Sequence, residues 1–107
     1  MSNLYRIQQL LGFLEEEPDN PFNLYALALE YQSHDPEKAR PYFDRLLEDH
    51  KEYLPTYYQA AAFYAEEGDL DRARDIYERG IELAQKAKQP QTLKELENAY
   101  RNFLFEI

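Results

Sequence analysis

The chain has 107 residues, of which 44% are hydrophobic, and a formal net charge of −9 from 21 acidic and 12 basic side chains. This length suits one domain with a single core. Cysteine is absent, which excludes disulfides, zinc–thiolate sites and thiol nucleophiles. An acidic surface repels phosphate backbones and anionic lipids, so nucleic acid and membrane surfaces are poor partners, whereas a basic protein segment would be attracted. Solubility alone, or a salt-rich environment, would also account for the charge.

Residue usage favours helices throughout the chain. Valine and tryptophan are absent, and the other β-branched residues amount to four Ile and two Thr. Ala, Leu, Glu, Gln, Lys and Arg dominate, and these residues prefer helix to strand. The first 17 residues contain a single base and only scattered apolar residues, and no apolar run approaches a membrane span. We therefore expect an all-α, soluble, cytoplasmic protein.

Apolar residues at helical spacing, separated by short polar breaks, predict six helices. The first is expected from Asn3 to Glu17, the second from Pro21 to about Ser33, the third from Pro36, the fourth from Pro55, the fifth from Leu70 to Lys88 and the sixth from Thr92. The first helix should align one apolar stripe, which comprises Leu4, Ile7, Leu11 and Leu14, with Leu10 and Phe13 beside it.

Residues at the breaks predict how these helices start and stop. Asn20 and Asp69 are expected N-caps, because each precedes an apolar-periodic segment. Gly68 is the expected left-handed residue at the end of the fourth helix. Thr92, followed three residues later by Glu95, predicts a capping box at the start of the sixth.

One pattern of apolar and small residues occurs twice. Its first copy is Leu24-x2-Leu27-Ala28-x2-Tyr31, then Ala39-x3-Phe43, and its second is Tyr57-x2-Ala60-Ala61-x2-Tyr64, then Ala73-x3-Tyr77. The first half recurs after 33 residues and the second half after 34, so the first copy lacks one residue between Tyr31 and Ala39. Repeats of this length indicate a solenoid, in which each unit buries its apolar face against its neighbours.

The repeated pattern resembles the tetratricopeptide repeat, a helix–turn–helix unit with the motif W-x2-L-G-x2-Y, then A-x3-F, then proline. The resemblance implies a right-handed α–α superhelix of about six antiparallel helices. It divides the chain into a half-repeat helix at 3–17, repeats at 21–53 and 54–87, and a capping helix at 90–107. The missing Trp, and the missing Gly after Leu27 and Ala60, mark a divergent version.

Small residues recur where helices of such repeats cross closely. They are Ala28, Ala39, Ala61, Ala73 and Gly80. Gly80 costs about 1 kcal/mol of helix propensity relative to Ala, so we expect a close contact at that position to compensate.

In the tetratricopeptide repeat family, the first helices of the units line a concave groove that receives peptides or helices. The matching residues here are Phe22, Tyr25, Leu29 and Gln32 in the first repeat, with Tyr58, Gln59, Ala62 and Glu66 in the second. Exposed Tyr and Leu are good anchors, because they bury area at little entropic cost. The alternative is that the N-terminal helix covers Tyr25 and Leu29 and makes them core.

The same face lacks every base that the family's best-known binding mode uses to clamp a partner's carboxylate. That mode is therefore not expected, and a groove of Tyr, Gln and Glu suits an apolar or basic segment better. This predicts a scaffold or adaptor that binds a protein or peptide.

Chemistry-bearing groups are sparse along the chain. His34 and His50 lie near expected helix ends without a serine nucleophile nearby, so a surface role is favoured over catalysis. The acidic stretch at 66–71 lacks the glycine-centred loop and distal Glu of a calcium site. No phosphate-binding glycine loop is present. We expect no active site, no cofactor and no metal.

A homo-oligomer without a separate peptide ligand is the second interpretation. The incomplete first unit and the apolar ending Phe103-Leu104-Phe105-Glu106-Ile107 motivate it. Phe105 lies off the main apolar stripe of the sixth helix, which leaves apolar surface for a partner subunit.

Overall fold

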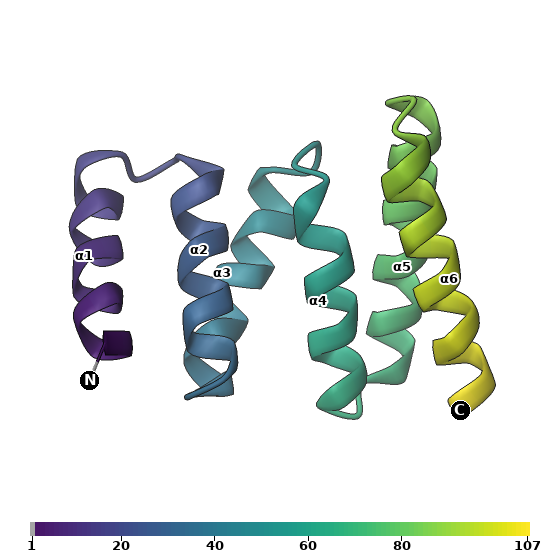
Figure 1. Ribbon diagram of the computed structural model, residues 1–107, viewed down its shortest axis with the longest axis horizontal. Helices are drawn as coiled ribbons and strands as arrows, with labels where there is room; N and C mark the ends of the chain where they lie inside the picture. Colours follow the sequence, from purple (N-terminus) through teal and green to yellow (C-terminus); the bar gives the residue numbers. More distant parts are fainter. Residues whose placement is uncertain (1) are drawn as a thin grey trace. The chain divides into compact units, whose positions relative to one another are not determined.

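The computed structural model describes residues 2–107, and among these residues every regular element is an α-helix (Figure 1). The six helices are α1 (Ser2–Glu16), α2 (Pro21–Gln32), α3 (Pro36–Asp49), α4 (Pro55–Glu66), α5 (Leu70–Lys86) and α6 (Pro90–Glu106). The chain divides into two compact units, one ending at Tyr53 and the other running from Leu54 to Ile107. The first unit contains α1, α2 and α3, and the second contains α4, α5 and α6.

Short polar residues start and stop several of these helices as predicted. The side-chain oxygen of Asn20 accepts a hydrogen bond from the N–H of Phe22 at 2.9 Å, which caps α2. Asp69 accepts one from the N–H of Arg72 at 3.3 Å and caps α5. Gly68 has φ +87°, a left-handed conformation that glycine adopts without steric cost, and it follows the end of α4.

The start of α6 differs from the prediction. The helix begins at Pro90 instead of Thr92, so Gln89 is the N-cap and Thr92 lies within the first turn. Proline favours the first helical position, because its φ is already helical and its missing N–H would have no partner there. The predicted capping box of Thr92 with Glu95 is therefore wrong, and Glu95 instead accepts a hydrogen bond from Gln91 at 3.2 Å.

The first unit is built around α2, which packs against α3 on one side and α1 on another. The residues it buries most completely are Leu24, Leu27, Ala28, Ala39, Phe43 and Leu46. They are the residues of the first copy of the repeated pattern other than Tyr31, which is half-buried, together with Leu46. The unit thus buries the stripe that the sequence predicts for α2 and α3.

Helix α1 buries a different set of residues from the stripe predicted for it. Ile7 and Leu10 pack with Leu27 of α2, whereas Leu4 and Leu11 are exposed. The difference follows from its neighbours, because α2 alone of the described helices packs against α1, so one narrow side of α1 is covered. Leu14 of the predicted stripe is partly buried against the same cluster, whereas Leu4, Leu11 and Phe13 stay at the surface.

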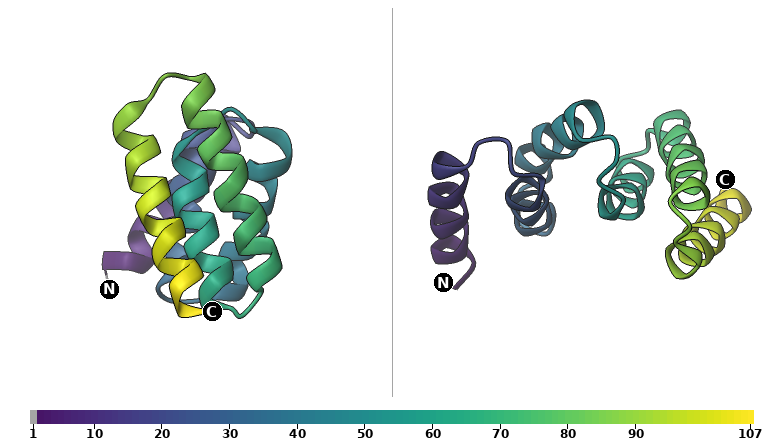
Figure 2. Two further views of the ribbon diagram at one scale, coloured as in Figure 1. Left: turned by 90° about the vertical axis from the view of Figure 1, so that its right-hand side faces the viewer. Right: turned by 90° about the horizontal axis from the view of Figure 1, so that it is seen from above.

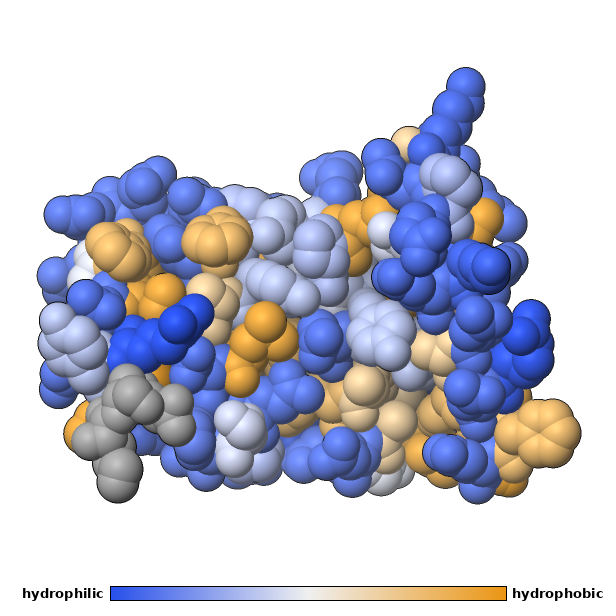
Figure 3. Space-filling model, viewed as in Figure 1, coloured by the Kyte–Doolittle hydropathy of each residue, from blue (hydrophilic) through white to orange (hydrophobic). Residues whose placement is uncertain are grey.

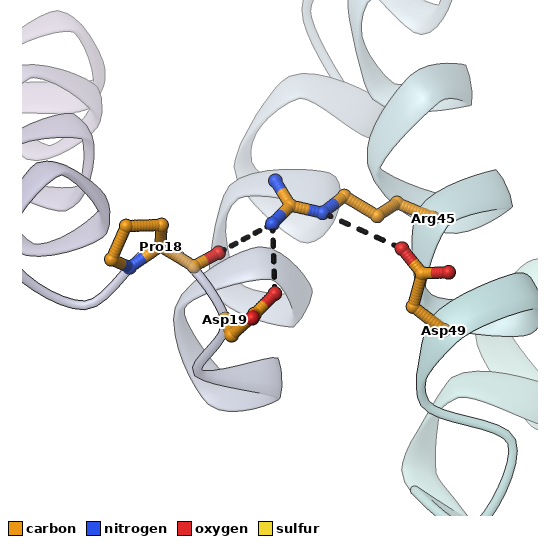
Figure 4. Close-up of polar contacts among 4 residues, drawn as sticks. All are labelled: Pro18, Asp19, Arg45 and Asp49. Atoms are coloured by element: carbon orange, nitrogen blue, oxygen red, sulfur yellow. Dashed lines mark hydrogen bonds and ion pairs between the residues drawn. The ribbon is translucent and has the colours of Figure 1, made fainter.

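A single arginine of α3 holds the turn between α1 and α2 (Figure 4). The Arg45 guanidinium donates to the carbonyl of Pro18 at 2.7 Å and to the carboxylate of Asp19 at 3.1 Å. Its Nε also lies 3.9 Å from the Asp49 carboxylate. The turn is thus tied to α3 by charge-assisted hydrogen bonds.

The second unit packs α4 against α5, with α6 beside α5 and contacting α4 (Figure 2). Its buried residues include Tyr57, Ala60, Ala61, Tyr64, Ala73, Ile76, Tyr77, Ala84, Leu96 and Phe103. Gly80 of α5 faces Tyr57 of α4 so closely that an added Cβ would lie 2.6 Å from the Tyr57 Cβ. The predicted close contact at Gly80 is confirmed.

Candidate partner-binding surface

One side of α2 carries the four residues predicted for the first repeat. Phe22, Tyr25, Leu29 and Gln32 follow one another at intervals of three or four, so they share one face of the helix. Phe22 is 60% exposed, and the other three are half-buried. We call these four residues the α2 row.

The contacts of α1 with α2 lie along a different line of residues. The Asn23 side chain donates to the Phe13 carbonyl at 3.4 Å, and Glu30 pairs with Arg6 at 2.6 Å. Between them, Leu27 packs with Ile7 and Leu10. Asn23, Leu27 and Glu30 are spaced by four and three residues and form their own face of α2, beside the α2 row.

Tyr25 is the more buried of the two aromatic residues in the α2 row. Its ring meets the Tyr53 ring edge-on, with the ring centroids 5.8 Å apart. Burial, and then the neighbouring Tyr53 phenol, raise the pKa of Tyr25 above its usual 10.0, so its hydroxyl stays neutral well into the alkaline range. The ring is thus held in place before any partner arrives.

The second repeat presents its own four residues on α4. Tyr58 is 42% exposed and Glu66 is exposed, while Gln59 and Ala62 are half-buried. We call these four residues the α4 row. The neighbouring Tyr57 and Tyr64 are buried, so the helix separates core tyrosines from a surface one.

Neither row contains a basic residue. Glu66 is an acidic residue at the end of the α4 row. Glu30 lies beside the α2 row, but it forms an ion pair with Arg6. The chemistry of both rows is therefore aromatic, apolar and amide.

Sequence reasoning did not select Phe13 as a surface residue. Its side chain is 51% exposed, and its carbonyl meets the first turn of α2 through Asn23. Figure 3 shows apolar side chains gathered over the upper ends of α1 and α2, in the first unit. From the helical period alone, Phe13 is expected beside the apolar stripe of the first helix. Its exposure depends on where α2 lies, which the sequence does not indicate.

The two histidines differ in their surroundings. His34 is exposed, and His50 is half-buried with a buried Nε2 that has no hydrogen-bond partner within residues 2–107. No group of His, Asp or Glu side chains in this part of the chain could hold a metal ion. Over the same residues, none of the helices has both the length and the apolar composition that crossing a bilayer requires.

Comparison with known proteins agrees with this architecture. The family model described as tetratricopeptide repeat matches residues 30–96. A solution structure of a tetratricopeptide repeat domain protein from Salinibacter ruber is 35% identical, with a TM-score of 0.76 over 81% of this chain and 89% of that one. A crystal structure of a tetratricopeptide repeat domain protein from the same organism is 34% identical, with a TM-score of 0.74 over 78% and 96%.

A third similar structure is a protein from Bordetella parapertussis, 25% identical with a TM-score of 0.78 over 94% of this chain and 88% of that one. No curated protein matches the chain. The matched model covers more than half of the sequence, and it contains the whole second copy of the repeated pattern and the end of the first, from Tyr31 onward. The all-α helical repeat therefore belongs to the tetratricopeptide repeat family.

Proposed function

We propose that this protein is a non-enzymatic scaffold that binds a protein or peptide segment through the α2 row and the α4 row. These rows lie on the helices that line the concave face in the family it belongs to. The observation that carries the proposal is the α2 row itself. Phe22 is 60% exposed on a helix whose other sides are covered by α1 and α3, so the row is the side left for a ligand.

The chemistry of the rows supports an extended or helical segment with apolar side chains. Tyrosine offers a large contact area at low entropic cost, because only two side-chain torsions must be fixed. Tyr25 is already ordered by Tyr53, which lowers that cost further. Leu29 beside it adds apolar area of the kind that a partner's Leu or Phe would cover.

Charge supports a basic character for the rest of the segment. Up to Tyr53 the sequence has 11 acids and 5 bases, a net −6, and from Leu54 it has 10 acids and 7 bases, a net −3. Such a surface steers a cationic chain toward it and repels nucleic acid and anionic membranes. The proposed partner therefore has apolar anchors and flanking Lys or Arg residues. We further propose that the protein acts in the cytoplasm.

The proposal is tested with a peptide selected by display against the wild-type chain and then labelled for fluorescence anisotropy. We expect Tyr25→Ala and Tyr58→Ala each to weaken binding by about tenfold, because each removes an aromatic anchor. Tyr5→Ala is the matched control, since Tyr5 is exposed on α1 outside both rows, and it should leave the affinity unchanged.

Circular dichroism on the same variants separates binding from folding. An unchanged affinity in both row variants would exclude the rows as the binding surface. Global melting of the Tyr25 variant would show that this ring serves the core, which is the alternative that the sequence leaves open.

A further inference from the structure

The corner between α1 and α2 carries an apolar and acidic surface outside the two proposed binding rows, apart from Phe22, which it shares. We define this corner surface as Phe13, Glu16, Glu17 and Phe22. Phe13 and Phe22 are 51% and 60% exposed, and both carboxylates are exposed. Two hydrogen bonds hold the Phe13 carbonyl at this corner: the N–H of Glu17 donates to it at 2.9 Å, and the Asn23 side chain donates to it at 3.4 Å.

The corner surface is rigid and electrostatically unbalanced. Arg45 holds the intervening turn through Pro18 and Asp19. Glu16 and Glu17 have no cationic partner among the described residues, and they lie at the carboxyl end of α1, which has no basic residue in its last turn. The helix dipole places negative partial charge there, so a cation docked at this corner would relieve an existing repulsion.

Helix α6 carries the complementary chemistry. Lys94, Arg101 and Phe105 are spaced by seven and four residues, so they share one side of the helix, opposite the buried Leu96 and Phe103. We call them the α6 stripe. Phe105 is 89% exposed, the highest value among the exposed large hydrophobic residues of the described chain.

The cations of this stripe are available for a partner. No carboxylate within residues 2–107 pairs with Lys94 or Arg101, and the Arg101 guanidinium donates instead to the Asn98 side-chain oxygen at 3.0 Å. Glu95 is engaged by Gln91, while Glu97 lies at the edge of the stripe. Two cations and one large aromatic side chain therefore form the centre of the exposed side of α6.

We propose that the α6 stripe of one copy docks on the corner surface of a second copy of this chain. Phe105 would pack against Phe13 and Phe22, and Arg101 with Lys94 would neutralise Glu16 and Glu17. The occupant is a second copy because each chain carries both halves, with opposite charge and matching exposed aromatics. The inference shares Phe22 with the α2 row, and the variants that test it leave Phe22 and the other residues of both rows unchanged.

Such a contact joins two different surfaces, so it is heterologous. Repetition of the same contact produces either a closed ring or an open chain of copies. The net charge of −9 opposes association at long range, which makes the assembly weak and concentration-dependent.

Sedimentation velocity from micromolar to millimolar protein, with two defective variants, tests the proposal. The corner-defective variant carries Phe13→Ala, Glu16→Lys and Glu17→Lys, and the stripe-defective variant carries Arg101→Ala and Phe105→Ala. We expect the mass of the wild type to rise with concentration and each variant alone to stay monomeric. An equimolar mixture should form dimers and nothing larger, because one intact stripe meets one intact corner.

Matched controls place the same changes elsewhere. Glu48→Lys with Glu52→Lys on exposed acids of the first unit, and Leu70→Ala on an exposed leucine of the second, should self-associate like the wild type. Circular dichroism verifies that every variant is folded.

Three outcomes would overturn the proposal. A wild type that stays monomeric at millimolar concentration removes self-association altogether. Association that persists in both defective variants assigns it to another surface. A mixture that fails to form dimers while the wild type associates shows an interface between identical surfaces. A failure here leaves peptide binding by the rows untouched, since Tyr25, Leu29 and Tyr58 are unchanged in all variants.

Discussion

Gly80 shows how one residue fixes the spacing of two helices. Glycine within a helix is unfavourable by about 1 kcal/mol relative to alanine, yet Gly80 lies within α5. The reason is its distance to α4, because a Cβ at this position would lie 2.6 Å from the Tyr57 Cβ and 3.4 Å from a methyl group of Leu96. A contact below 3 Å cannot persist, so α4 or α6 would have to move.

Gly80→Ala should therefore destabilise the protein by about 1–3 kcal/mol, despite its better helix propensity, because overpacking outweighs the gain. Gly12→Ala is the control, since it lies within α1 and nothing is within 4 Å of the position its Cβ would take. That change should stabilise by up to about 1 kcal/mol. Urea denaturation measures both, and equal effects of the two substitutions would contradict the packing explanation.

At the scale of the element, the turn between α1 and α2 determines which residues reach the surface. Arg45 reaches from α3 to the Pro18 carbonyl and the Asp19 carboxylate, so an element distant in sequence holds this turn. The ends of the helices on either side of this turn could be predicted from Pro18, Asn20 and Pro21, because these residues act as local signals. The sequence could not indicate Arg45, because the partner is 26 or 27 residues away.

We expect Arg45→Ala to cost about 1 kcal/mol or less in global stability, because the guanidinium is 36% exposed and partly screened. Its local effect should be larger. Hydrogen exchange at the Asn20 amide, which donates to the Glu17 carbonyl at 3.2 Å, should accelerate several-fold. Lys86→Ala, which removes only a 4.0 Å pair with Glu82 within α5, should leave that exchange unchanged. Unaltered exchange in the Arg45 variant would show that the turn is held by its backbone alone.

At the scale of the whole molecule, the tyrosines make stability depend on alkaline pH. The pKa is raised above 10.0 for Tyr25, Tyr42, Tyr53, Tyr77 and Tyr100, in each case mainly by burial. For Tyr100, the hydrogen bond that its hydroxyl donates to Glu78 at 2.6 Å adds to the effect. The folded chain thus keeps these protons at a pH where the unfolded chain loses them.

The contribution of these tyrosines to the unfolding free energy should therefore be constant up to about pH 9 and fall as the pH rises through 10 toward the raised folded pKa values. The unfolded state binds fewer protons in that range, which makes the slope negative. Urea denaturation at a series of alkaline pH values measures it, and Tyr25→Phe should reduce the slope because one titrating group is lost. A stability that increases above pH 10 would contradict this sign.

Much of the helical content could be predicted from local signals. Proline, asparagine and glycine marked the breaks, and the recurrence of Leu24 to Tyr31 at Tyr57 to Tyr64 predicted most of the buried residues of α2 and α4. It did not predict that Tyr31 is only half-buried or that Phe63 is buried. These signals are local because helix periodicity and capping act over a few residues. The start of α6 was misplaced by two residues, since Thr92 and Pro90 both give valid start signals.

By itself, the sequence determined the all-α repeat, its family and the small residue at Gly80, because each follows from spacing along the chain. Only the tertiary structure decided which apolar residues are exposed. Leu4 and Leu11 are exposed and Leu10 is buried, because α2 covers only one narrow side of α1. The same holds for the exposure of Phe22, which both proposals about partners use, and of Phe13, which only the corner surface uses. The helical period in a sequence indicates only that certain residues share one face of a helix. Whether that face is buried depends on a second element that packs against it.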